Sequence, residues 1–78
     1  MSKKVIVFTQ PGRPPCRTVK AYLEDRGIEY EERDVTTNEQ FVFQLVRTYD
    51  SRTTPTLVIG EEVMVGFDPE RLDELMAS

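Results

Sequence analysis

The stretch VIVFTQPGRPPC, residues 5–16, decides the fold of this protein more than any other part of its sequence. It begins with an unbroken run of β-branched and aromatic residues, which is typical of a strand covered on both faces. A turn containing proline and glycine follows, and Pro14 and Pro15 then stand where the first turn of a helix tolerates proline. The pattern predicts a strand, a turn and a helix whose first turn carries Cys16, the only cysteine of the chain.

The helix predicted at residues 14–27 buries one stripe of side chains, because its apolar residues recur at helical spacing. That stripe consists of Cys16, Val19, Tyr22 and Leu23. Gly27 follows it, and a glycine in the left-handed conformation is a common end for a helix. We expect Cys16 to be buried with its stripe, as free cysteine often is.

The remaining elements follow from the same patterns. We predict strands at residues 28–35, 54–60 and 63–66 and helices at residues 36–51 and 67–78. The helix at residues 36–51 should turn the stripe Phe41, Val42, Leu45, Val46 and Tyr49 toward the core. Asp68 is the expected N-cap of the last helix. The order β-α-β-α-β-β-α predicts an α/β fold with a mixed four-stranded sheet flanked by helices, in which the last two strands form a hairpin.

The composition limits the classes of function. The chain has 10 basic and 14 acidic side chains and a net charge of −4, so nucleic acid is not an expected partner. No apolar run approaches the roughly 18 residues that a membrane span needs. One cysteine and no histidine do not make a set of zinc ligands. One cysteine also cannot form an internal disulfide, and the lack of an internal disulfide favours a reducing compartment. We expect a single cytoplasmic domain, residues 1–78, without a metal site or membrane contact.

Three motifs together resemble the glutaredoxins, and more narrowly the bacterial glutaredoxin-like and NrdH-type redoxins. They are VFTQPG-x-PPC at residues 7–16, TTPTLVIG at residues 53–60 and VGFDPERLDEL at residues 65–75. The resemblance covers nearly the whole chain. It implies a thioredoxin-like fold, thiol–disulfide exchange in electron transport and cell redox homeostasis, and no bound cofactor, with glutathione as a candidate co-substrate.

The resemblance also implies a C-x-x-C pair, in which the first cysteine is the nucleophile and the second is the resolving thiol. The positive end of a helix dipole favours a thiolate in the first turn, and a second thiol one turn later can attack the mixed disulfide. In this chain Arg13 occupies the nucleophile position and Cys16 the resolving position. An arginine cannot act as a thiolate, so we expect two-thiol activity to be impaired.

Three explanations of Arg13 stay open. One is a codon change in an otherwise active C-P-P-C protein, since arginine and cysteine codons can differ by one base. Another is divergence to a non-catalytic module of thioredoxin fold that binds a peptide or an anion through the arginine cation. The third is direct catalysis by Cys16. The structural alternative for Arg13 is a solvated loop cation.

The resemblance places a substrate- or glutathione-binding site on Gln10, Thr54, Pro55, Gly66, Phe67 and Asp68. It implies a cis peptide bond between Thr54 and Pro55, so that the Thr54 backbone can pair with a bound peptide like an added strand. An ordinary trans proline at the start of a strand is the alternative. Asp68 would hold the amino end of glutathione, although Val65 stands where the family usually has a glycine, and Gln10 stands where many members have a basic residue.

The function expected from the sequence is that of a glutaredoxin-like thiol–disulfide oxidoreductase scaffold. Its expected partners are disulfide-containing proteins or glutathione, with a thioredoxin-reductase-like flavoprotein as the other candidate electron donor. We expect the chain to be a monomer.

Overall fold

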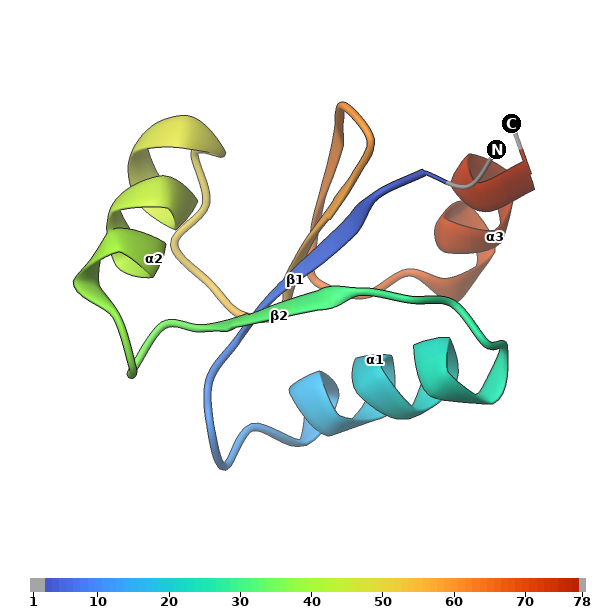
Figure 1. The fold of residues 1–78 in the computed structure, drawn as a ribbon, viewed down its shortest axis with the longest axis horizontal. Helices are drawn as coiled ribbons and strands as arrows, with labels where there is room; N and C mark the ends of the chain where they lie inside the picture. The colour runs from blue at the N-terminus through green and yellow to red at the C-terminus, as the bar shows by residue number, and fades with distance from the viewer. Residues whose placement is uncertain (1–2, 78) are drawn as a thin grey trace.

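The computed structural model describes residues 3–77, which form a four-stranded sheet between helices (Figure 1). The elements are β1 (Val5–Thr9), α1 (Pro14–Asp25), β2 (Glu31–Asp34), α2 (Glu39–Phe43), the π-helix η1 (Gln44–Thr48), β3 (Thr56–Ile59), β4 (Glu62–Val65) and α3 (Pro69–Ala77). This order confirms the predicted succession β-α-β-α-β-β-α.

The sheet is mixed, with the strand order β2-β1-β3-β4. β1 runs parallel to β2 and antiparallel to β3, and β3 and β4 form an antiparallel hairpin. The parallel pair is the one whose strands are joined through a helix, as a crossover connection requires. The predicted sheet is confirmed.

The side chains of β1 alternate between two cores, because successive residues of a strand point to opposite faces. One core contains Val5, Val7, Val19, Leu23, Leu57, Ile59, Met64, Leu72 and Leu75. The other contains Ile6, Phe8, Leu45 and Val58, with Val35, Phe41 and Tyr49 packed against them. α1 and α3 therefore cover one face of the sheet, and α2 with η1 covers the other (Figure 1).

Two predicted elements differ most in extent from those observed. The second strand was expected from residue 28, but β2 pairs with β1 only over Glu31–Asp34. Ile28 and Tyr30 lie before the strand and pack against the core of α1 and α3. The predicted helix at residues 36–51 is shorter and changes to π-helical hydrogen bonding at Gln44.

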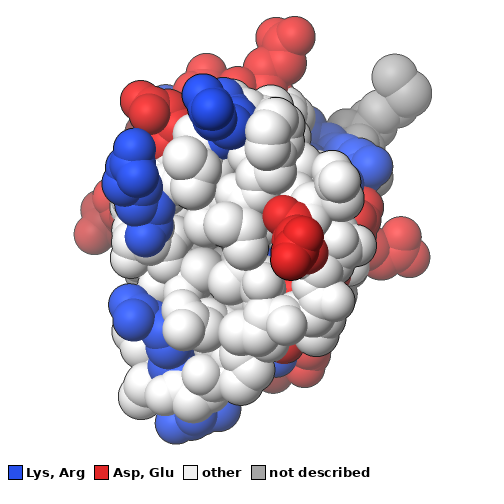
Figure 2. All heavy atoms as spheres, turned by 90° about the vertical axis from the view of Figure 1, so that its left-hand side faces the viewer, with Lys and Arg blue, Asp and Glu red and all other residues white. Residues whose placement is uncertain are grey.

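Val42 corrects the predicted stripe of the second helix. Its side chain is 44% exposed, and Phe43 beside it is 58% exposed. Phe41, Leu45 and Tyr49 already fill the contact with the sheet, so the flank of this short helix that carries Val42 meets no other element. In Figure 2, which looks onto the side where α2 lies, the middle of the surface is largely uncharged, and lysine and arginine side chains lie along its left and lower edges.

Gly27 and Asp68 stand at helix ends as the sequence predicts, and Asn38 caps α2. Gly27, which follows the C-cap residue Arg26 of α1, has a φ of 66°, which glycine adopts without a side-chain clash. Asn38 Oδ1 accepts a hydrogen bond from the Gln40 amide at 2.8 Å, and Asp68 Oδ1 accepts one from the Arg71 amide at 3.2 Å. Asp68 is therefore the N-cap of α3, as expected. Within residues 3–77, no helix combines the length and the apolar character that crossing a bilayer requires.

Candidate functional site

Three segments that are distant in the sequence enclose one open groove of about 540 Å³. They are the start of α1, the loop before β3 and the turn after β4. The lining residues are Pro14, Pro15, Thr18, Thr54, Pro55, Gly66 and Phe67. Proline rings and an aromatic ring form most of this wall, so the groove suits an extended ligand with an apolar side chain.

The loop before β3 contributes its backbone to the groove. The Thr54-Pro55 peptide bond is cis, which confirms the sequence expectation. The Gly66 amide donates a hydrogen bond to the Pro55 carbonyl oxygen at 2.9 Å. Gly66 has a φ of 84°, a region that side chains other than glycine rarely adopt. This contact holds the cis-proline loop and the turn after β4 side by side.

Arg13 reaches the same loop from the other wall. It is the N-cap residue of α1, with an extended backbone and no side-chain capping bond. Its Nη2 donates a hydrogen bond to the Thr54 carbonyl oxygen at 3.3 Å. No carboxylate of residues 3–77 forms an ion pair with Arg13. Its guanidinium is therefore a cation without a charged partner, beside a backbone acceptor of the groove.

The start of α1 offers few backbone donors of its own. Pro14 and Pro15 have no amide hydrogen, and the Cys16 amide already donates to the Arg13 carbonyl at 3.0 Å. Arg13 does not line the groove itself, and the donor that its side chain supplies here is directed at the Thr54 carbonyl oxygen.

Cys16 lies below the groove surface. Its side chain is 3% exposed, which confirms the predicted burial, and it does not line the groove. Position 13 and Cys16 are one helical turn apart, as the bond between the Arg13 carbonyl and the Cys16 amide shows. The spacing of a two-thiol site is thus kept, while no thiol of this chain reaches the groove.

The other residues expected at the site divide into two groups. Thr54, Pro55, Gly66 and Phe67 line the groove together, whereas Gln10 and Asp68 do not. Gln10 Oε1 accepts a hydrogen bond from Thr54 Oγ1 at 3.4 Å, so it supports the loop. Asp68 is occupied as the cap of α3.

Pro14, Pro15 and Thr18 line the groove without having been expected to. The two prolines were interpreted only as a helix start. Thr18 follows Pro14 by one helical turn on the exposed side, and its hydroxyl donates to the Pro14 carbonyl at 3.2 Å. That spacing was the available signal, because residues four apart share a helix face.

Phe67 is fixed by a cluster between α1 and α3. Its ring meets Tyr22 edge-on, with centroids 5.2 Å apart. The Tyr22 hydroxyl donates to Asp73 at 2.9 Å, and the Arg26 guanidinium lies 3.5 Å from the centre of the Tyr22 ring. Partial burial, followed by the hydrogen bond to Asp73, raises the pKa of Tyr22. The groove wall at Phe67 is thereby attached to both helices of this face.

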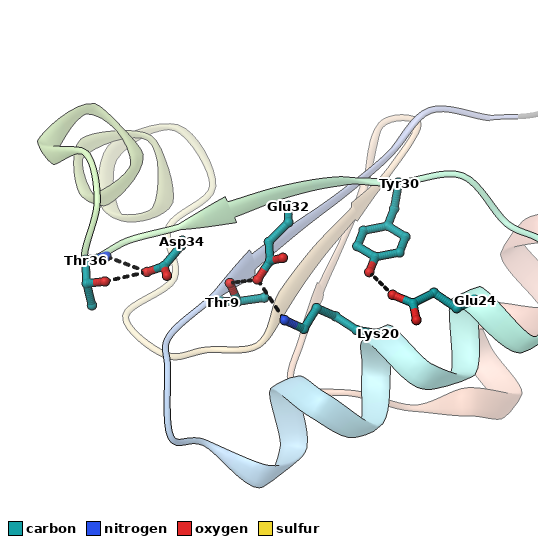
Figure 3. Close-up of polar contacts among 7 residues, drawn as sticks. All are labelled: Thr9, Lys20, Glu24, Tyr30, Glu32, Asp34 and Thr36. Atoms are coloured by element: carbon teal, nitrogen blue, oxygen red, sulfur yellow. Dashed lines mark hydrogen bonds and ion pairs between the residues drawn. The ribbon is translucent and has the colours of Figure 1, made fainter.

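Figure 3 shows how the strand that leads into the Arg13 turn is anchored. Thr9, at the end of β1, is buried, and its hydroxyl donates to Glu32 Oε2 at 2.7 Å. Lys20 Nζ of α1 donates to the same oxygen at 3.0 Å. One carboxylate therefore ties β2 to both elements that flank the turn. Among residues 3–77, no group of three or more His, Cys, Asp or Glu side chains could hold a metal ion.

Comparison with known proteins adds the family. The glutaredoxin family model matches residues 5–65. The SPbeta prophage-derived thioredoxin-like protein YosR of Bacillus subtilis is 34% identical over 79 residues, covering 94% of each chain. The crystal structure of the thioredoxin-like protein BC3987 is similar at a TM-score of 0.87 and 44% identity, covering 91% of this chain and 97% of that one.

A more distant structure is similar in fold alone. The glutaredoxin-like protein NrdH-redoxin of Escherichia coli superposes with a TM-score of 0.79 at 22% identity, covering 92% of this chain and 93% of that chain. The fold is therefore thioredoxin-like, as the sequence motifs implied. With a family match across most of the chain and a groove built from the expected motifs, this protein belongs to the glutaredoxin family.

Proposed function

We propose that this chain is a glutaredoxin-type thiol–disulfide exchange scaffold in which Arg13 disables two-thiol chemistry. The observation that carries the proposal is the hydrogen bond from Arg13 to the Thr54 carbonyl. Arg13 stands at the position where the family has its nucleophile, and this bond holds its cation beside the cis-proline loop. A cation cannot attack a disulfide. Cys16, at 3% exposure, is too buried to replace it. We place the protein in the cytoplasm, with disulfide-containing proteins or glutathione as its partners.

The missing chemistry can be written as two exchanges. A thiolate at position 13 would attack one sulfur of a mixed disulfide, form a new S–S bond and release the other sulfur as a thiolate. The Cys16 thiolate would then attack that bond and release the second thiol, which leaves a disulfide between positions 13 and 16. Two electrons from glutathione or a flavoprotein reductase would restore the dithiol. Only the first attacking group is absent from this chain.

Arg13→Cys tests the proposal directly. We would measure reduction of a glutathione mixed disulfide and of insulin, with glutathione and its reductase in one arm and a thioredoxin reductase in the other. The variant should exceed the unmodified chain by about tenfold or more in at least one arm, equal to about 1.4 kcal/mol of activation free energy. Arg13→Ser is the matched control, because it removes the cation without adding a thiol, and it should stay inactive.

Two results would contradict the proposal. Strong activity of the unmodified chain, lost on Cys16→Ser, would make Cys16 the nucleophile. Inactivity of Arg13→Cys with every donor, in a folded protein, would show that the groove does not support exchange.

The second candidate function is a non-catalytic binding module. The observation that favours it is an apolar groove wall close to the Arg13 cation, which forms no ion pair with any carboxylate of residues 3–77. Titration of the unmodified chain with glutathione, followed by amide chemical shifts, tests this function. Shifts at Thr54 and Gly66 that weaken in Arg13→Ala would support it, and no shifts at the groove would exclude glutathione as the ligand.

A further inference from the structure

The two edges of the sheet differ in how they are protected. β2, at one edge, has the sequence EERD and carries only charged side chains. β4, at the other edge, has the sequence EVMV, with Val63 41% and Val65 57% exposed. Natural edge strands usually carry charge, proline or a bulge that prevents pairing with another chain. In β4 the only charged residue is Glu62, at its start.

The backbone register shows which groups of β4 are free. The Gly66 amide donates to Pro55, next to the paired residues Val65 and Thr56. This bond identifies Val65 and Thr56 as a pair that exchanges no hydrogen bonds with each other, and such pairs alternate along an antiparallel ladder. Val63 and Val58 are therefore the next pair of that kind. The N–H and C=O groups of Val63 and Val65 point away from β3.

Nothing in the described part of the chain covers this edge. No hydrogen bond to the outward groups of Val63 or Val65 occurs within residues 3–77. α2 and η1 pack on β1 and β3 through Ile6, Phe8 and Val58, and do not extend over β4. In Figure 1 the hairpin of β3 and β4, drawn in orange, rises between α2 and α3 with its tip free.

We propose that β4 is a self-association edge, which pairs antiparallel with β4 of a second copy of this chain. In the proposed register Val63 lies opposite Val65 of the second copy, and Val65 opposite its Val63, so the outward groups of both valines are used. Each valine then exchanges both of its outward backbone groups with the valine opposite. The same register brings the exposed side chains of the two pairs together on one face of a continuous sheet.

A second copy fits this edge because the register opposes no like charges. Glu62 falls opposite Gly66 of the second copy, which has no side chain, and Met64 falls opposite its own counterpart. Each copy carries a net charge of −4, so added salt should strengthen the pairing. An interface of one short strand is small, and such interfaces are weak. In this pairing the tip of the β3–β4 hairpin of each copy would lie beside Gly66 of the other copy, which lines that copy's groove.

Concentration-dependent measurements test the pairing. We would record sedimentation and amide spectra from about 20 µM to about 1 mM, at low and at moderate salt. We expect a rising dimer fraction, larger in salt, and concentration-dependent shifts centred on the amides of Val63 and Val65. Val63→Lys should abolish association. Val42→Lys is the matched control, because Val42 is 44% exposed but lies on α2, and it should dimerise as the unmodified chain does.

Three outcomes would overturn the proposal. One is a monomer throughout the concentration range. Another is association that Val63→Lys leaves unchanged, or shifts centred on α2, which would place the interface elsewhere. The third is a β4 edge that binds an extended foreign peptide while the chain itself stays monomeric. None of these results bears on the Arg13→Cys test, so the two proposals stand or fall separately.

Discussion

The Arg13 guanidinium hydrogen-bonds the Thr54 carbonyl oxygen at 3.3 Å, although the two residues are 41 positions apart in the sequence. The bond links the N-cap of α1 to the residue that precedes the cis proline. It therefore bridges, through a side chain, the start of α1 and the loop before β3, which form two walls of the groove. One of the two lone pairs of the Thr54 carbonyl oxygen therefore accepts from Arg13.

Removing the Arg13 side chain should break its bond to Thr54 and lower the stability of the fold only slightly. Arg13→Ala should lower the free energy of unfolding by about 1 kcal/mol or less, since one partly exposed hydrogen bond is lost. The carbonyl carbon shift of Thr54 should change at the same time. Arg17→Ala is the control, because Arg17 is an exposed cation of α1 whose side chain forms no hydrogen bond or ion pair with residues 3–77. An unchanged Thr54 signal in Arg13→Ala would contradict the bond.

Cys16 should resist modification in the folded protein. Its 3% exposure leaves little room for a bulky maleimide to approach the sulfur. We expect the maleimide to label Cys16 slowly in buffer and fast in denaturant, and mass spectrometry would measure both rates. Labelling in buffer at the rate of the denatured chain would mean that the first turn of α1 opens readily, and would revive Cys16 as a nucleophile.

The cap of α3 should matter for stability rather than for ligand binding. Asp68→Ala should cost about 1 kcal/mol, because the Arg71 amide loses its acceptor. Asp68→Ser should recover most of the loss, since a serine hydroxyl also accepts a capping bond. Denaturant unfolding of both variants gives the comparison. Equal stability of Asp68→Ala and the unmodified chain would show that this capping bond contributes nothing in solution.

Asp34 makes the free energy of unfolding depend on pH in the acidic range. Hydrogen bonds from the Thr36 hydroxyl, and then from its amide, hold the pKa of Asp34 below its usual value of 3.8 (Figure 3). A carboxyl whose pKa is lowered in the folded state stabilises the protein above its unfolded pKa, and the contribution is lost as pH falls through the folded value.

Thr36→Val isolates this contribution, because it removes the hydroxyl and keeps the side-chain shape. The pKa of Asp34, followed by its side-chain carbon signal, should rise toward 3.8 in the variant. The stability difference between the two proteins should be present at neutral pH and shrink as the pH falls below 3.8 and through the lowered folded pKa of Asp34. A difference that persists unchanged in acid would assign the effect of Thr36 to packing.

The sequence by itself determined the order of the elements and the residues that end α1 and begin α3. Runs of β-branched residues, helical spacing, and local signals such as Gly27 and Asp68 act through neighbours in the chain, so they can be interpreted without a structure. The burial of Cys16 followed from its helical stripe. The cis bond at Pro55 followed from a motif, because the residues around it are those of the family.

Only the tertiary structure decided which of these residues meet. The contact of Arg13 with Thr54, the groove walls at Pro14 and Thr18, and the separation of Asp68 from the groove depend on how α1 and β3 dock. Val42 was misplaced for the same reason, since helical spacing predicts an apolar flank but not whether another element covers it. Contacts between distant segments follow from the packing of the whole chain, and no local pattern encodes that packing.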